Sequence, residues 1–294
     1  MTITVRAYTD SDAEFVMGTR KEWEPTLGED FLRRLVAGQV APIVYLGIAE
    51  VDGTPAGYAM VTSPTDTPNA VKVAVVRRAH RGQGVGRALA TALDTVLPGE
   101  TAESWVSDED ERDLAIAKHW GYSVTSHSIE SLLTKDKVGP PSELPVGYTA
   151  KSMADADIDS DFETRVDALM LRGSTHPEFV ELGWTISVAE LRHYSSDSQW
   201  AFVMQGDEPV AACIAAPRTG PSWVVGFTVV DPEHRGQGLA RIVKQHLHLR
   251  AVDLGASDLA TMNEDRNVGI RALNASMGYV KIGGELRLKR EANL

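Results

Sequence analysis

An internal repeat of domain size constrains the fold of this chain most strongly. Residues 80–87 read His-Arg-Gly-Gln-Gly-Val-Gly-Arg, and residues 234–241 read His-Arg-Gly-Gln-Gly-Leu-Ala-Arg. A Gly-Tyr pair follows each copy, at residues 121–122 and 278–279. Similar landmarks in one order, separated by half the chain, indicate a duplicated domain and not a solenoid of short repeats.

The beginnings of the two copies also match, since residues 6–12 and 151–157 share an Asp-x-Asp pattern. Between the copies, residues 136–145 contain three prolines and a glycine, which block regular structure. The expected organisation is an N-terminal domain over residues 1–137, a linker over 138–146 and a C-terminal domain over 147–294.

Each half is expected to fold in the order strand, two helices, three strands, helix, strand, helix, strand. In the first half, Asp-Gly at residues 52–53 joins two apolar runs and predicts a β-hairpin. Val85, Leu89 and Leu93 recur at helical spacing and predict an amphipathic helix that begins in the glycine motif. The fold class is therefore α/β, with a mixed sheet in each of two domains.

Composition excludes several classes of partner. The formal net charge of −12 argues against a nucleic acid or an anionic membrane surface, both of which need clustered Lys and Arg. No apolar run approaches the ~18 residues of a membrane helix, and the first residues lack a signal-peptide core. We expect a cytoplasmic protein that acts as a monomer or homodimer.

Cysteine and histidine give no sign of a metal site. The single cysteine, Cys213, lies in an apolar run, which favours a buried structural residue over a nucleophile and leaves no disulfide. His246 and His248 are two residues apart on a predicted helix, so their side chains diverge. We expect no bound metal.

The repeated glycine motif lies between a β-branched strand and a helix. Glycine lets the chain turn tightly and lets a ligand approach the backbone, while the free N–H groups of the first helical turn bind anions. The spacings of a Walker loop and of a Rossmann fingerprint are both absent, which disfavours a nucleotide-binding protein. The remaining alternative is a glycine turn that binds no ligand. It is disfavoured because the motif occurs twice, in the same context in each half.

The pattern Arg-x-x-Gly-x-Gly/Ala between the fourth strand and the next helix resembles the acyl-CoA pyrophosphate loop of the GNAT acetyltransferases. The matching positions are Arg81, Gly84 and Gly86 in the first half and Arg235, Gly238 and Ala240 in the second. The layout is similar to that of mycothiol synthase and other tandem GNAT proteins, in which one half commonly carries the reaction.

The resemblance implies acetyl-CoA as the cofactor. Its pantetheine arm would lie where the fourth and fifth strands splay apart, and a backbone N–H of the fourth strand would polarise the thioester carbonyl. The cofactor-binding residues implied in the second half are Thr228, Val229, Val230, Arg235, Gly236, Gln237, Gly238, Leu239, Ala240, Asn263, Asn267 and Asn274. Those implied in the first half are Val75, Val76, Arg81, Gly82, Gln83, Gly84, Val85 and Gly86.

In the family, an Asn lies at the start of the helix after the fifth strand, and a Tyr follows seven residues later. The two halves of this chain depart from that pattern in different ways. The second half has Asn267 and Asn274 at these positions, whereas the first has Asp110 and Ala117. We therefore expect the second half to be catalytic and the first to be structural or degenerate. Asn274, which would orient a water or the sulfur, and Tyr279, as an alternative acid, are the catalytic candidates.

The general base is not evident. Many family members carry a Glu on the fourth strand, but residues 70–76 and 222–230 contain no carboxylate. The candidates elsewhere in the second half are His176, Glu178 and Glu181, each of which also fits an ordinary surface residue. Trp184, Trp200 and Trp223 fit a substrate pocket or, more often, core packing.

The sequence thus predicts an N-acetyltransferase that transfers acetyl from acetyl-CoA to a primary amine of a small molecule, an antibiotic or a peptide. Without a suitable cysteine nucleophile, direct attack in a ternary complex is expected. The alternative is a catalytically silent CoA-binding protein that serves as a sensor or scaffold.

Overall fold

The computed structural model describes residues 1–24, 27–63, 69–96, 101–175, 186–194, 197–218 and 220–291. The chain divides into two compact units. Unit 1 comprises Met1–Ser126 and Leu286–Leu294, and unit 2 comprises His127–Glu285. Within the described ranges, no helix is long and apolar enough to cross a membrane.

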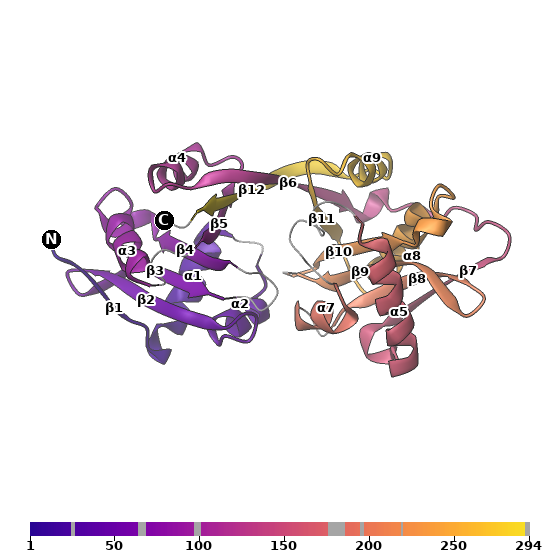
Figure 1. Cartoon of the computed structure of the whole chain (residues 1–294), viewed down its shortest axis with the longest axis horizontal. Helices are drawn as coiled ribbons and strands as arrows, with labels where there is room; N and C mark the ends of the chain where they lie inside the picture. Colours follow the sequence, from indigo (N-terminus) through magenta and orange to yellow (C-terminus); the bar gives the residue numbers. More distant parts are fainter. Residues whose placement is uncertain are drawn as a thin grey trace. The chain divides into compact units, whose positions relative to one another are not determined.

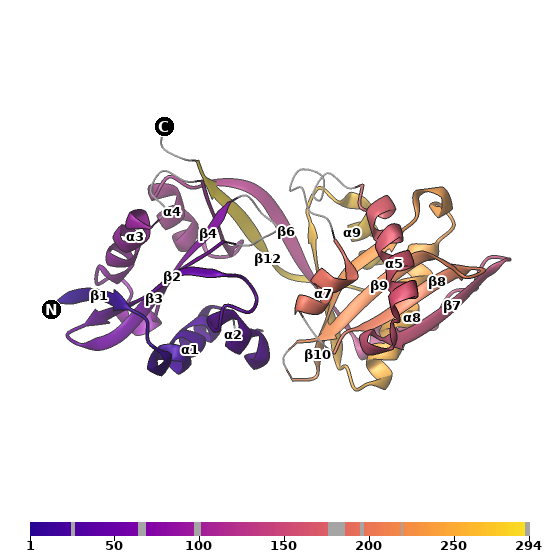
Figure 2. The ribbon, with the colours of Figure 1, turned by 60° about the horizontal axis from the view of Figure 1, so that its bottom comes forward.

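Unit 1 is built on a mixed sheet with helices on both faces (Figures 1 and 2). Its first elements are β1 (Ile3–Ala7), η1 (Asp10–Asp12), α1 (Ala13–Trp23), α2 (Glu29–Val36), β2 (Ile43–Val51), β3 (Thr54–Thr62) and β4 (Ala70–Val76). Then come η2 (Arg78–His80), α3 (Val85–Thr95), β5 (Ala102–Ser107) and α4 (Glu111–His119). Strands β1 to β4 pair antiparallel in sequence order, and β4 pairs parallel with β5.

Alternation along β4 directs its side chains to the two faces of the sheet. Val73 and Val75 pack in the cluster that contains Val16 of α1. Ala74 and Val76 pack against the cluster formed with α3, on the other face. The strand that precedes the glycine loop is therefore anchored on both sides.

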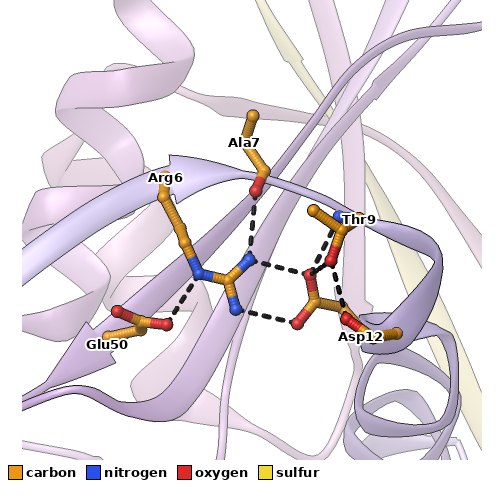
Figure 3. Close-up of polar contacts among 6 residues, drawn as sticks. Arg6, Ala7, Thr9, Asp12 and Glu50 are labelled. Carbon is orange, nitrogen blue, oxygen red and sulfur yellow. Dashed lines mark hydrogen bonds and ion pairs between the residues drawn. The ribbon is translucent and has the colours of Figure 1, made fainter.

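Arg6 fixes the entry into α1 (Figure 3). Its Nη1 and Nη2 donate to the Asp12 carboxylate at 2.7 and 2.8 Å, and its Nε donates to Glu50 at 2.7 Å. The N–H and hydroxyl of Thr9 donate to the same carboxylate, and these bonds, with that from Arg6 foremost, lower the pKa of Asp12. The Asp-x-Asp pattern of the first half, at residues 10–12, thus has a structural role in unit 1.

Unit 2 repeats the architecture. Its elements are η3 (Lys135–Lys137), β7 (Tyr148–Ala154), η4 (Asp155–Asp157), α5 (Ser160–Gly173), α7 (Val188–Tyr194), β8 (Gln199–Gln205), β9 (Glu208–Pro217), β10 (Ser222–Val230), η5 (Pro232–His234), α8 (Leu239–Asp253), β11 (Asp258–Glu264) and α9 (Val268–Ser276). Strands β7 to β10 pair antiparallel in order, and β10 pairs parallel with β11. The predicted α/β class with a mixed sheet is confirmed.

The last strand of each half leaves the unit in which it starts. Strand β6 (Ser123–Thr134) begins in unit 1, and its residues from Ser128 onward pair antiparallel with β11 in unit 2. Strand β12 (Val280–Arg290) begins in unit 2, and its end lies next to β5 in unit 1. Each unit is therefore completed by a strand that belongs to the other half of the sequence.

Candidate functional site: the glycine loops and the cleft of unit 1

The two glycine loops have the same backbone conformation. Gly82 and Gly84 have φ of +78° and +92°, and Gly236 and Gly238 have φ of +78° and +79°, a region that glycine occupies without strain. Gly84 and Gly238 are the N-caps of α3 and α8, and no side chain caps either helix. Each loop thus presents the N–H groups of a helical first turn to an anionic group.

The loop arginine has a structural contact that is common to both halves. Arg81 Nε donates to the carbonyl of Val76 at 3.4 Å, and Arg235 Nε donates to that of Val230 at 3.3 Å. In unit 2, Arg235 Nη2 also donates to the carbonyl of Gly173, at 3.0 Å. The Arg235 guanidinium is therefore partly committed to the end of α5.

A cleft of about 690 Å³ opens where β4 and β5 separate. The strands pair only at Ala70↔Ala102 and Val71↔Glu103, and beyond this point the cleft runs between them to the glycine loop. Its walls come from β4, the loop, β5 and α4, and we call it the unit 1 cleft. The lining includes Val73, Ala74, Val75, Val76, Arg81, Gly82, Gly84, Gly86, Arg87, Ser104, Trp105, Val106, Arg112, Asp113, Ala117, Trp120 and Tyr122.

Positive charge is concentrated beside this cleft. Residues 77–87 contain four arginines and no acidic residue. Arg81 and Arg87 line the cleft, as does Arg112 of α4, whereas Arg77 forms an ion pair with Glu22. The matching residues 231–241 of unit 2 carry Asp231 and Glu233 beside two arginines. In a chain of net charge −12, this local excess favours an anionic ligand in unit 1.

A glycine loop at a helix N-terminus, beside splayed parallel strands, is the arrangement that the sequence predicted. The sequence model of the "Acetyltransferase (GNAT) family" matches residues 6–122 and 168–279. The chain belongs to this family. No curated protein sequence matches it.

Solved structures of GNAT proteins share the fold. A tandem GNAT protein from the clavulanic acid biosynthesis pathway, solved without AcCoA, aligns with 100% of this chain and 99% of its own, at 18% identity and a TM-score of 0.78. A GCN5-related N-acetyltransferase from Sphaerobacter thermophilus aligns with 98% of this chain and 95% of its own, at 17% identity and a TM-score of 0.67. The tandem arrangement predicted from the repeat is confirmed.

Asp113, Tyr122 and Lys72 are titratable side chains of the unit 1 cleft that were not among the predicted site residues. Burial, and then the charge of Asp110, raise the pKa of the Asp113 carboxyl. Burial also raises the pKa of Tyr122, which belongs to the repeated Gly-Tyr pair. Lys72 on β4 is buried, and its Nζ donates to the carbonyl of Val96 at 2.9 Å. The cleft of this GNAT domain thus holds a carboxyl group and a phenol, and burial favours the neutral form of both.

The position expected to bind the cofactor arm caps a helix in both units. Asp110 is the N-cap of α4 and accepts a hydrogen bond from the N–H of Asp113 at 2.9 Å. Asn267 is the N-cap of α9, where its side chain accepts from the N–H of Ile270 at 3.5 Å. Asp and Asn cap helices equally well, so the difference between the halves is compatible with one structural role.

In unit 2 the structure brings Asn263 and Asn274 together. Asn274 is buried, its Nδ2 donates to Asn263 Oδ1 at 2.7 Å, and its own Oδ1 has no partner. The pairing of β10 with β11 ends at Val225↔Thr261. The predicted residues Thr228, Val229 and Val230 lie beyond this point and belong to a splayed segment, as the resemblance implies.

Tyr279 lies in the core of unit 2. It is 6% exposed, and its hydroxyl shares a hydrogen bond of 2.9 Å with His248 Nε2. Cys213 is also buried, as expected, with its Sγ 3.1 Å from the hydroxyl of Thr228. Burial raises the pKa values of both Tyr279 and Cys213, which keeps them neutral.

The remaining predicted residues divide into two groups. His176, Glu178, Glu181 and Trp184 lie outside the residues that the structure describes. Trp200 and Trp223 are buried in the core of unit 2. Among the described residues, no group of three or more His, Cys, Asp or Glu is placed to hold a metal ion.

Proposed function

We propose that the chain is a cytoplasmic N-acetyltransferase that binds acetyl-CoA in the unit 1 cleft. It would transfer the acetyl group to a primary amine of a small molecule, an antibiotic or a peptide, by direct attack in a ternary complex. The observation that carries the proposal is the 690 Å³ cleft, which connects the splayed edges of β4 and β5 with a positively charged glycine loop. Acetyl-CoA supplies an activated acyl group and an anionic pyrophosphate that suit these two ends.

The residues of the cleft have separable tasks in this proposal. The N–H groups at the start of α3, with Arg81 and Arg87, hold the pyrophosphate. Backbone N–H groups of β4 beyond Val71, where the pairing with β5 has ended, would orient the thioester carbonyl. Asp113 and Tyr122 line the cleft and would accept or return protons, directly or through water.

Unit 2 is the alternative site of the reaction, as the sequence predicts. The Asn263–Asn274 pair supports it, because the unpartnered Oδ1 of Asn274 is a buried acceptor in need of a donor. Against it, Glu233 precedes the loop of unit 2, and Arg235 is partly engaged with α5, while the buried Asp231 is paired with Arg172.

A matched pair of variants distinguishes the units. Gly86 and Ala240 occupy the same place in the two helices, and neither has a positive φ. A Cβ on Gly86 would meet its nearest neighbour, Val76, at 3.7 Å, which is ordinary contact. Gly86→Glu therefore adds a negative charge beside the proposed pyrophosphate position with room for its Cβ, and Ala240→Glu adds the same charge in unit 2.

We expect Gly86→Glu to remove acetyl-CoA binding in a calorimetric titration and Ala240→Glu to retain it. The reverse result would assign the cofactor to unit 2. Normal binding in both variants would refute the role of the loops. Release of free CoA thiol with a panel of amines then separates an enzyme from a silent CoA-binding sensor, which would bind acetyl-CoA without turnover.

A further inference from the structure

Glu103 lies at the point where β4 and β5 part. We call the pairs Ala70↔Ala102 and Val71↔Glu103 the fork, because the parallel pairing ends there and the cleft begins. Glu103 is 6% exposed. A carboxylate buried at such a point is costly unless it is paired and hydrogen-bonded.

Two side chains satisfy this carboxylate. Asn69, just before β4, donates from Nδ2 to Glu103 Oε1 at 2.8 Å. Arg287 donates from Nε to Oε2 at 3.0 Å and also bonds it through Nη2. Glu103 therefore connects the start of β4, the start of β5 and strand β12.

The residue after Arg287 backs the wall of the cleft. Leu288 is fully buried and packs with Val106 of β5 and Ala117 of α4. Val106 and Ala117 line the unit 1 cleft. The end of β12 lies beside β5 (Figure 1), so a segment from the end of the chain supports the side of the cleft opposite β4.

We propose that Arg287 is a positioning residue for the acetyl-CoA site of unit 1. By fixing Glu103, it sets the separation of β4 and β5 and so the width of the cleft at Ser104 and Trp105. This inference rests on the proposed function, and Arg287 itself does not touch the cofactor. Without Arg287, the buried Glu103 carboxylate requires hydration, and β5 moves at the fork so that water reaches the carboxylate.

The fork of unit 2 is held in another way. It ends at Val225↔Thr261, where the Thr261 hydroxyl donates to the carbonyl of Val225 at 3.2 Å. This neutral bond joins β10 and β11 directly. Replacement of Arg287 should therefore affect ligand binding in unit 1 and leave the fork of unit 2 unchanged.

The test uses the full chain with Ala240→Glu, so that only the loop of unit 1 remains intact. In this parent, acetyl-CoA affinity is measured by calorimetry for Arg287→Met, for Arg287→Lys and for two controls. Lys289→Met removes an exposed ion pair with Glu291 on the same strand. Leu32→Ala opens the core at α2, away from the fork, and reports what loss of stability alone does to affinity.

We expect Arg287→Met to weaken acetyl-CoA binding at least tenfold and Lys289→Met to stay within about threefold of the parent. Arg287→Lys keeps the positive charge but loses the paired Nε and Nη2 donors, so its affinity should fall between these two variants. The loss in Arg287→Met should exceed that in Leu32→Ala at an equal fall in melting temperature. Parent-like affinity in Arg287→Met, or a loss no larger than that of the core control, would overturn the inference.

Failure of the proposed function gives a different result. If the Ala240→Glu parent does not bind acetyl-CoA, or if adding Gly86→Glu leaves its binding unchanged, unit 1 is not the cofactor site, and the role assigned to Arg287 there is also overturned. If Gly86→Glu abolishes binding but Arg287→Met does not weaken it, only the inference is wrong. Should Arg287→Met fail to fold, Glu103→Gln removes the same ion pair at nearly constant shape, and the same two outcomes apply.

Discussion

The pair formed by His248 and Tyr279 couples the stability of unit 2 to pH. Burial, and then the charge of Lys244, hold the pKa of His248 well below its ordinary value of 6.5. The folded protein therefore keeps this imidazole neutral, while the unfolded chain binds a proton below about pH 6.5. Since the unfolded state binds more protons, stability falls with pH below that point.

We expect the melting temperature of unit 2 to decline as the pH is lowered from about 7.5 to about 5.5, a range that spans the histidine titration. The contribution of His248 is at most about 1.4 kcal/mol per pH unit. His248→Gln should flatten the decline, and thermal scans across this range measure it. An equally steep decline in the variant would show that another group is responsible.

Tyr279 should matter for stability and not for proton transfer. Tyr279→Phe removes its hydrogen bond to His248 and should lower the free energy of unfolding by about 1 kcal/mol. The pH dependence of kcat/KM for acetyl transfer should not change. A basic limb in the wild-type profile that disappears in Tyr279→Phe would identify Tyr279 as the acid instead.

At the residue scale, the sequence predicted the loop better than the rest of the site. Positive φ at Gly84 and Gly238 follows from local chemistry, so the two copies of the motif indicated it directly. Asp113 was not predicted, because its place in the cleft depends on how α4 lies against β5. Asn267, which the resemblance implies as a cofactor ligand, caps α9, and a polar residue at a helix start fits both roles.

Helix α4 allows the contribution of its N-cap to stability to be measured separately from the effect of the Asp110 charge on ligand binding. Asp110 caps this helix and places a carboxylate near the cleft. Asp110→Asn should keep the cap and stay within about 0.5 kcal/mol of the wild-type stability, while Asp110→Ala should cost about 1 kcal/mol.

The Asp110 variants also test whether the ligand of the unit 1 cleft is anionic. With one negative charge fewer beside an anionic cofactor, Asp110→Asn should bind acetyl-CoA a few times more tightly than the wild type, by an amount that shrinks as salt is added. Calorimetric titrations at two salt concentrations measure this. Weaker binding in Asp110→Asn would indicate that the carboxylate contacts a donor of the ligand.

Local signals predicted the elements well. The hairpin at residues 52–53 forms, with φ of +49° at Asp52 and +82° at Gly53, as expected for a tight turn with an Asp-Gly pair. The partners of β6 and β12 were not predictable. A strand shows the same alternation whichever neighbour it joins, so the repeat does not reveal that the last strands are exchanged.

For the whole molecule, the exchange makes the end of the chain part of unit 1. A chain that stops after Glu285 lacks Arg287 and Leu288 and leaves Glu103 without its ion-pair partner. We expect hydrogen exchange in β5 and α4 of this chain to be much faster than in the full protein. A chain that stops after Glu291 is the control and should behave like the full protein, whereas unchanged protection in the shorter chain would contradict the expectation.

The exchange also fixes the order in which the protein matures on the ribosome. After β5 and the start of β6 emerge, about 160 further residues must be synthesised before β12 is available, which takes roughly 10–30 s at about 5–20 residues/s. Throughout that interval β5 is an open sheet edge, a feature that invites association with other strands. Nascent unit 1 therefore keeps this open edge until β12 has been synthesised.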